Sequence, residues 1–256
     1  MARRIRGATR LYQEQPEGGS STLLVVVRLL LVALLVGAAA WGGQQLLDPA
    51  QFPLRTVRIE SQLRHVSQAT IRDSVQPYVK AGFLGVDVDA VRDGLEALPW
   101  VESASVRRAW PDRLVIRVNE QQALARWGVD ALVNLRGEVF APPQDESWGS
   151  LPLLRGPRDT NRMVAEQYMA MQGMLKPLGL VITHLTLDDR RAMSLRLDNG
   201  LQLGLGRQDT DLRMLRFVRV YPQALQPRLA AIDSIDLRYT NGFAVRWRDG
   251  FGPSSV

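Results

Sequence analysis

The sequence predicts an α+β protein with a single N-terminal transmembrane helix, a small β-α-α-β-β domain, and a mostly antiparallel β domain with flanking helices. Three observations support this prediction. Residues 23–40 form an uninterrupted apolar run. Residues 54–118 then show strand-like, helix-like and again strand-like periodicity. Beyond residue 122, short alternating segments are separated by turn residues, which include two Asn-Gly pairs.

The apolar run from Leu23 to Ala40 has the length of a membrane-spanning helix. It contains one charged residue, Arg28, and no proline. As a helix it would extend about 27 Å, close to the hydrocarbon thickness of a bilayer. Arg28 lies near the N-terminal end, where its side chain can reach the headgroups, and Trp41 suits the opposite interface. We therefore expect a transmembrane helix over residues 23–41.

The charges around this helix predict its orientation. Residues 1–22 contain four arginines and few large apolar residues, as expected of a disordered cytoplasmic tail. A linker at residues 42–52 and everything after it should then lie across the membrane. The alternative is a cleaved signal peptide, because Ala38-Ala39-Ala40 resembles a cleavage site, but the apolar run is longer than the usual signal core. A buried helix of a soluble protein would need no arginine cluster on one side.

The composition narrows the classes of function. About 200 residues remain beyond the anchor, enough for one large or two small domains. The chain has no cysteine, which excludes disulfides, thiolate metal ligands and thiol nucleophiles. The net charge of +6 comes almost entirely from arginines that are spread along the chain. Arginines spread in this way argue against a nucleic-acid partner. They favour a solvent-exposed surface that contacts acidic proteins or anionic lipid.

The first domain is predicted at residues 53–121. A half-buried strand at Leu54–Glu60 precedes a helix that Ser67 can cap, and Asp87 or Asp89 can cap a second helix that ends before Pro99. Glycines at 82 and 85 mark a loop between the helices. Two strands follow, at residues 103–107 and 114–118. The residues Trp110-Pro111-Asp112-Arg113 form the turn between them.

The second domain is predicted at residues 122–248, followed by a flexible tail at 249–256. Three prolines mark a long surface loop after residue 141, and Asp159 or Thr160 starts a helix that Pro177 and Gly179 end. A second helix is expected at Leu212–Val220. The expected strands lie at residues 123–127, 131–135, 138–140, 181–187, 193–197, 201–205, 235–239 and 243–247.

No residue set predicts catalysis. The two histidines, His65 and His184, lie far apart in the sequence, and no hydrolase, metalloprotease or phosphate-binding motif is present. The Gly204-Leu205-Gly206 segment lacks the rest of a dinucleotide-binding motif, and close backbone packing explains it better. We therefore expect no catalytic, cofactor or metal site, and a protein that works by binding.

Several segments together closely resemble the FtsQ/DivIB family of bacterial cell-division proteins. The resemblance covers the chain from the anchor to Trp247. It rests on the following segments: Leu98-Pro99-Trp100-Val101, the run from Val106 to Leu114, Glu120, Ala125-Arg126-Trp127, Gly204-Leu205-Gly206-Arg207, Arg216-Phe217-Val218, Tyr221-Pro222, and Asp236-Leu237-Arg238-Tyr239.

The resemblance implies a non-enzymatic scaffold of the division machinery. Members are single-pass proteins of the inner membrane with a cytoplasmic N-terminus. Their periplasmic part is a POTRA domain followed by a β domain, and they link early and late division proteins at the septum. FtsB and FtsL are the closest partners, through the β domain. Other membrane proteins of the divisome are expected to meet the POTRA domain and the membrane region.

In the family, FtsB adds a strand to the sheet edge near the C-terminal end of the β domain. In this chain that edge corresponds to residues 243–247. Tyr239 would provide a rigid anchor, and arginines could pair with acidic partner residues. The partner-binding residues that the resemblance implies are Arg190, Arg191, Arg238, Tyr239, Gly242, Phe243, Val245 and Trp247.

Other interpretations remain open at this point. Tyr239 shares its alternation with Leu237, so it could belong to the core, as could Phe243, Val245 and Trp247. For Trp100 and the Trp110 turn we expect a core aromatic and a tight turn rather than a contact surface. The alternative functions are a POTRA-containing periplasmic assembly or secretion factor, and a hydrolase that acts on the cell wall.

Overall fold

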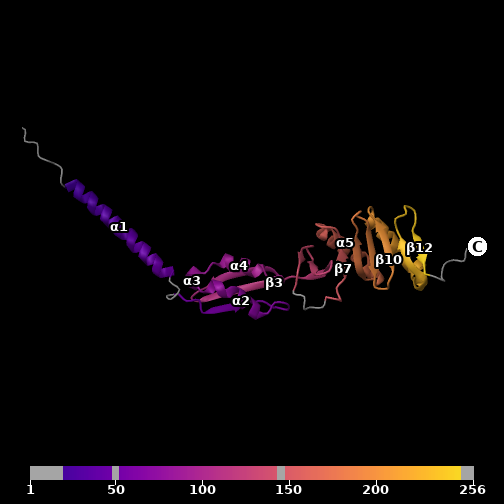
Figure 1. Ribbon diagram of the computed structural model, residues 1–256, viewed down its shortest axis with the longest axis horizontal. Coiled ribbons are helices and arrows are strands. Elements are labelled where there is room, and N and C mark those ends of the chain that lie inside the picture. The colour runs from indigo at the N-terminus through magenta and orange to yellow at the C-terminus, as the bar shows by residue number, and fades with distance from the viewer. Residues whose placement is uncertain (1–19, 48–51, 143–147, 249–256) are drawn as a thin grey trace, which may run out of the picture.

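The computed structural model of the chain describes residues 20–47, 52–142 and 148–248. The remaining parts of the expected tails, residues 1–19 and 249–256, lie outside the described residues. A long N-terminal helix leads to two domains that follow one another along an extended molecule (Figure 1). The C-terminal strand β12 lies near the end opposite to the helix (Figure 1).

The N-terminal helix α1 spans Ser20–Leu47. Its segment Leu23–Gly43 is long and apolar enough to cross a membrane, and the large apolar side chains from Leu23 to Trp41 are exposed. The helix extends further than the residue pattern indicated. Residues 20–22, which we assigned to the tail, and residues 42–47, which we assigned to the linker, are helical.

The first domain has the predicted β-α-α-β-β order. Ser67 caps α2, since its Oγ accepts the Thr70 N–H at 3.0 Å, and the Asp87 carboxylate caps α4 in the same way. The expected loop at 82–85 is instead a short helix. The elements are β1 (Thr56–Ile59), α2 (Gln68–Val79), α3 (Gly82–Gly85), α4 (Val88–Glu96), β2 (Val101–Ala109) and β3 (Arg113–Glu120). The sheet order is β1-β3-β2, with β1 parallel to β3 and β2 antiparallel to β3.

The β domain is built on a nine-stranded sheet in the order β12-β11-β10-β9-β8-β7-β4-β5-β6. Its strands are β4 (Ala123–Trp127), β5 (Ala131–Asn134), β6 (Val139–Phe140), β7 (Leu153–Arg155), β8 (Ile182–Leu187), β9 (Met193–Leu197), β10 (Gln202–Gly206), β11 (Ile232–Asp236) and β12 (Ala244–Trp247). Three pairings are parallel, namely β4–β7, β7–β8 and β10–β11, and the other five are antiparallel.

Two helices cover one face of this sheet. Helix α5 (Asn161–Leu175) and helix α6 (Thr210–Val220) contribute residues such as Met171 and Phe217 to a core shared with Leu185 and Leu195 of the strands. Beyond α6 the chain continues in irregular helical turns over Tyr221–Leu225 and Gln226–Ala231, which the residue pattern did not predict. The opposite face of strands β8 to β12 carries polar side chains and is open to solvent.

Strand β7 was missed because it lies in the expected surface loop. It has only three residues, too few to show alternation. It is positioned by its neighbours, since it pairs in parallel with β4 on one side and with β8 on the other. The strand expected at residues 235–239 is also shifted, because β11 ends at Asp236.

The two domains share part of a hydrophobic core. Leu132 of the β domain is buried among first-domain side chains, and Phe140 and Trp148 pack against the same cluster. Trp100 is 4% exposed and stacks on His65 with ring centroids 4.0 Å apart. This confirms Trp100 as a core aromatic.

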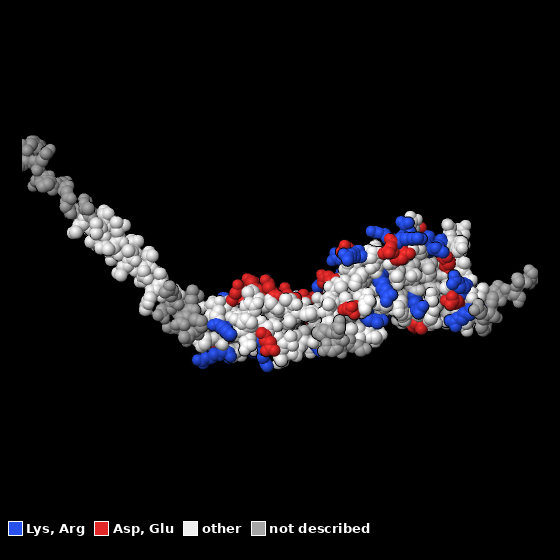
Figure 2. All heavy atoms as spheres, in the orientation of Figure 1, with Lys and Arg blue, Asp and Glu red and all other residues white. Residues whose placement is uncertain are grey.

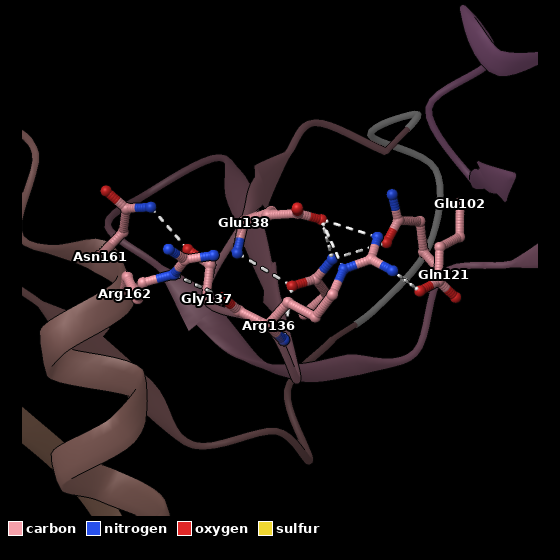
Figure 3. Close-up of polar contacts among 8 residues, drawn as sticks. Glu102, Gln121, Arg136, Gly137, Glu138, Asn161 and Arg162 are labelled. Carbon is pink, nitrogen blue, oxygen red and sulfur yellow. Dashed lines mark hydrogen bonds and ion pairs between the residues drawn. The ribbon is translucent and has the colours of Figure 1, made fainter.

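Polar contacts reinforce this joint (Figure 3). Arg136 forms an ion pair with Glu102, and the Asn134 side-chain amide donates to Gln121 Oε1 at 2.9 Å. In the first domain, the Glu120 carboxylate accepts the backbone N–H groups of residues 64–66. The first domain therefore packs at the β5–β6 end of the sheet, and the β12 end is left on the far side.

Candidate partner-binding edge

Strand β12 forms the free end of the nine-stranded sheet. It pairs with β11 through the register Asp236↔Ala244, Ile235↔Val245 and Ser234↔Arg246. No other strand within the described residues pairs with its outer side. An unpaired edge of this kind presents backbone N–H and C=O groups that an incoming strand can satisfy.

The hydrogen bonds of β11 and β12 identify the backbone groups that face outward. The Arg248 N–H donates to the Ala231 carbonyl at 2.8 Å, so it points toward β11. Because N–H groups alternate in direction along an antiparallel strand, those of Val245 and Trp247 point away from β11. The Leu237 N–H donates to the Gly204 carbonyl of β10 at 2.8 Å, so it points away from β12. The direction of the N–H groups along β11 therefore agrees with the alternation along β12.

The apolar side chains of this edge face the core. Phe243, Val245 and Trp247 are partly buried and pack against the main hydrophobic cluster of the β domain. Ala244 and Arg246 are exposed between them on the open face of the sheet. The three apolar residues therefore hold the edge strand in place, and its outward backbone groups remain available for pairing.

The strand register brings most of the predicted binding residues, namely Arg190, Arg191, Arg238, Tyr239, Gly242 and Phe243, to the same end of the strands, which we call the rim. Trp247 lies at the other end of β12, opposite Ile232. The β8–β9 turn, the end of β10, the end of β11 and the start of β12 all lie at the rim, because Leu187 pairs with Met193, Met193 with Gly206, and Asp236 with both Gly204 and Ala244. Residues that are about fifty positions apart in the sequence thus lie around one rim.

Arg190 and Arg191 occupy the β8–β9 turn. Asp188 organises this turn, since its backbone carbonyl accepts the Arg191 N–H at 2.8 Å and its carboxylate accepts the Ala192 N–H at 2.7 Å. Arg191 has a φ of 61°, a left-handed conformation that is uncommon for a residue other than glycine and that follows from the geometry of this turn. Both arginine side chains are exposed, and neither forms an ion pair within the described part of the chain.

Arg238 differs from these two arginines because it already has an acidic partner. Its guanidinium contacts both carboxylate oxygens of Asp236, with the Nη2–Oδ2 distance at 2.6 Å. The hydrogen bond from Arg238 holds the pKa of Asp236 below its ordinary value, assisted by the backbone N–H of Arg238. An acidic partner residue would therefore have to share Arg238 with Asp236.

This pair predicts a pH-dependent contribution to stability. A carboxylate with a lowered folded-state pKa stabilises the fold above its unfolded pKa of about 3.9, and this contribution is lost as the pH falls through the folded-state value. We expect Asp236→Asn to lower the free energy of unfolding by less than about 1 kcal/mol at neutral pH, because the pair is solvent-accessible. Urea denaturation at pH 7 and pH 3 should show the difference from the unsubstituted protein shrinking at pH 3. Asp233→Asn on the same strand is the control, and an Asp236→Asn effect that is equal at both pH values would contradict the assignment.

Tyr239 lies on the segment between β11 and β12 and is 58% exposed. It is therefore not part of the core, although Leu237 two residues earlier is fully buried. Arg216 of α6 holds this segment from below, since its Nη1 donates to the Tyr239 carbonyl at 2.8 Å and to the Gly242 carbonyl at 3.1 Å. Arg216 was not among the predicted residues. It belongs to the Arg216-Phe217-Val218 segment of the family resemblance, but a helix surface rich in arginine gave no sign of its partner.

We expect Arg216→Met to loosen the segment from Tyr239 to Gly242. The change removes two hydrogen bonds from a charged donor and should cost about 1–2 kcal/mol of unfolding free energy. Amide hydrogen exchange of residues 239–243 should accelerate. Arg219→Met, which alters an exposed arginine one turn along the same helix, is the matched control, and equal exchange in both variants would contradict the role of Arg216.

Gly206 allows Arg238 and α6 to approach the end of β10. It has a φ of 76°, and a Cβ placed there would lie 2.9 Å from Arg213 Nη1 and 3.0 Å from Arg238 Cγ. The left-handed backbone conformation explains this glycine, and its nearest neighbours are arginine side chains rather than the backbone that we expected. At Gly204 the nearest atoms to a Cβ would be 3.9 Å away, so close packing does not explain that glycine either.

A polar groove of about 570 Å³ connects this rim with the open face of the sheet. It is lined by His184, Arg196, Gln202, Ser234 and Arg246, and it reaches Arg238. Burial, followed by the charges of Arg196, Arg126 and Arg155, lowers the pKa of His184. Asp188 and Asp236 also line the groove, so it is a polar surface with charges of both signs next to the free edge.

Comparison with known proteins identifies two regions of the chain. The family described as "POTRA domain, FtsQ-type" matches residues 52–121, and the one described as "Cell division protein FtsQ/DivIB, C-terminal" matches residues 125–238. Among curated relatives, the cell division protein FtsQ of Coxiella burnetii is 35% identical over 80% of this chain and 84% of its own length. Its counterparts in Xanthomonas campestris and Shewanella oneidensis are each 38% identical over 80% of this chain, covering 74% and 78% of their own lengths.

Proposed function

This chain belongs to the FtsQ/DivIB family of cell-division proteins, and from this premise we propose that it is a non-enzymatic membrane scaffold that binds FtsB and FtsL through the β12 edge. It would thereby link early and late division proteins at the septum. The family is one of division scaffolds rather than enzymes. In this chain the first domain is a POTRA domain of the FtsQ type.

The observation that carries the proposal is the free outer edge of β12. The other end of the nine-stranded sheet is β6, which has only two residues and lies at the joint with the POTRA domain, where Leu132 and Phe140 pack and Arg136 pairs with Glu102. Strand β12 is therefore the longer free edge, at the end of the sheet away from this joint. Backbone pairing supplies affinity, and side chains around the rim supply specificity.

The rim residues suit an acidic partner segment beside the added strand. Tyr239 is exposed and is anchored through its backbone by Arg216, so it can serve as a rigid aromatic contact. Arg190 and Arg191 carry charges that no described acidic residue neutralises, and an arginine can bind a carboxylate bidentately. Arg238 offers less unpaired positive charge to an acidic partner than Arg190 and Arg191 do, because Asp236 already pairs with it.

We propose that α1 places both domains in the periplasm. The helix fits a single-pass membrane protein, and the arginines that precede it favour a cytoplasmic N-terminus. The protein would then be a type II protein of the inner membrane. The POTRA domain, close to the membrane, would meet other divisome proteins.

Tagging the full chain in growing cells tests this function. We expect bands at mid-cell during division and co-purification of FtsB and FtsL. An evenly distributed peripheral signal together with co-purification of outer-membrane assembly or secretion components would overturn the proposal in favour of a POTRA-containing assembly factor. A protease-protected C-terminal part in intact spheroplasts would overturn the proposed orientation.

A further inference from the structure

Trp110 occupies an unusual position at the β2–β3 turn. Its side chain is 82% exposed, more than that of Tyr239. We expected a core aromatic at Trp100 and a tight turn at Trp110-Pro111-Asp112, and the structure confirms both. A tryptophan with this exposure contributes little to the hydrophobic core, so the packing of the domain does not explain it.

The turn lies at the end of the POTRA domain that adjoins the membrane helix. The Asp112 carbonyl accepts the N–H groups of Arg55 at 3.0 Å and Thr56 at 3.3 Å, which places the turn beside the start of β1. In the same region the Phe83 N–H donates to the Phe52 carbonyl at 2.7 Å, and α3 lies against the end of α1 (Figure 1).

The length of the chain between α1 and the domain keeps this end close to the bilayer. Only residues 48–51 separate Leu47, at the end of α1, from Phe52. A fully extended chain spans at most about 3.6 Å per residue, so the five steps from Leu47 to Phe52 reach at most about 18 Å. The apolar span ends at Gly43, four residues before the helix does.

Cations lie at the same end of the domain. Arg55, Lys80 and Arg113 are exposed there, and Figure 2 shows blue side chains next to the linker. The only ion pair of these three within the described residues is the long contact of Arg113 with Asp112, at 3.9 Å. The acidic side chains of this domain gather instead on α4, at Asp89, Asp93 and Glu96, and Figure 2 shows a red row along this face.

We propose that Trp110, together with Arg55, Lys80 and Arg113, forms a second membrane contact of this protein, with the indole in the headgroup region of a bilayer that contains anionic lipid. Tryptophan is the side chain best suited to that region because it combines a large apolar ring with a hydrogen-bond donor. The three cations meet the negative surface potential of the bilayer. The contact fixes the end of the POTRA domain on the membrane, while the β12 edge lies at the other end of the molecule. It requires α1 in a bilayer and does not depend on strand addition at β12.

The absence of native cysteine allows a direct test. The full chain carrying Ala109→Cys is labelled with an environment-sensitive fluorophore and reconstituted into vesicles of phosphatidylethanolamine and phosphatidylglycerol that contain a lipid with a spin label near its headgroup. We expect strong quenching at position 109, as at a Trp41→Cys site in α1, and none at Asn241→Cys near the β12 edge. Adding Trp110→Ser to Ala109→Cys should reduce the quenching at least twofold.

Charge substitutions test the contribution of the cations to membrane contact separately from that of the tryptophan. Changing Arg55, Lys80 and Arg113 together to glutamine should lower quenching at position 109 in anionic vesicles to the value seen in vesicles of phosphatidylcholine alone. No quenching at 109 while the Trp41→Cys site is quenched would overturn the proposal. Shielding of the label at 109 only after FtsB and FtsL are added would also overturn it, in favour of a protein partner at this turn. Binding of FtsB to the β domain, measured on the same variants, should stay unchanged in every case.

Discussion

Replacing Val245 with proline is expected to weaken FtsB binding by at least about 10- to 100-fold, while the β domain stays folded. Val245 directs its N–H away from β11, so proline removes a donor that no described group of the chain uses. The ring also occupies the space that an added strand needs. Proline is tolerated on a sheet edge when its nitrogen faces outward, and thermal unfolding should therefore show only a small loss of stability. Titration of the extracytoplasmic part of FtsB measures the effect.

Val245→Ala is the matched control for this prediction. Alanine removes more of the packing between Val245 and the core than proline does, but it keeps the backbone N–H. We expect nearly unchanged FtsB binding per folded molecule in Val245→Ala. Equal binding losses in both variants would show that the valine side chain matters rather than the free edge, and equal retention would show that FtsB binds elsewhere.

Replacing Tyr239 with alanine is expected to weaken FtsB binding by about 2 kcal/mol, or roughly 30-fold, which is the range for an aromatic anchor at an interface. The side chain is 58% exposed and is not part of the core, so unfolding free energy should change by less than about 0.5 kcal/mol. The Arg216 hydrogen bond to the Tyr239 carbonyl remains possible in the variant. Calorimetric titration with FtsB and a thermal melt of the same sample measure both quantities.

Leu212→Ala controls for the loss of an exposed apolar side chain. Leu212 is also exposed on the β domain, but it lies on α6. This variant should bind FtsB like the unsubstituted protein. A melt lowered by many degrees in Tyr239→Ala, with binding intact per folded molecule, would refute the interface role of the tyrosine.

Local signals made most of the architecture predictable from the sequence. Ser67 and Asp87 are cap residues whose side chains bond to the first helical turn, and this chemistry is visible within a few residues. The same holds for the Asn199-Gly200 hairpin between β9 and β10, because glycine readily adopts the left-handed conformation seen at Gly200. The start and stop residues likewise predicted α5 nearly to its ends, and α6 begins at Thr210, two residues before the expected Leu212.

Features that depend on distant partners could not be predicted from local patterns. Strand β7 is too short to identify without β4 and β8. The exposure of Trp110 depends on how the turn packs beside β1. The hydrogen bond from Arg216 to the Tyr239 carbonyl joins residues that are 23 positions apart. The proposed partner-binding residues came from the family resemblance, and the structure adds that most of them lie around one rim, because register is a property of the whole sheet.

Hydrogen exchange at the edge strand is the most direct test of the proposal that FtsB adds a strand to β12. The amides of Val245 and Trp247 should exchange rapidly in the isolated protein, because they face outward from β12, and should become strongly protected when FtsB is bound. The Arg248 amide, which already bonds to Ala231, should change little and serves as an internal reference. Saturating FtsB that leaves the exchange of Val245 and Trp247 unchanged would contradict strand addition at this edge.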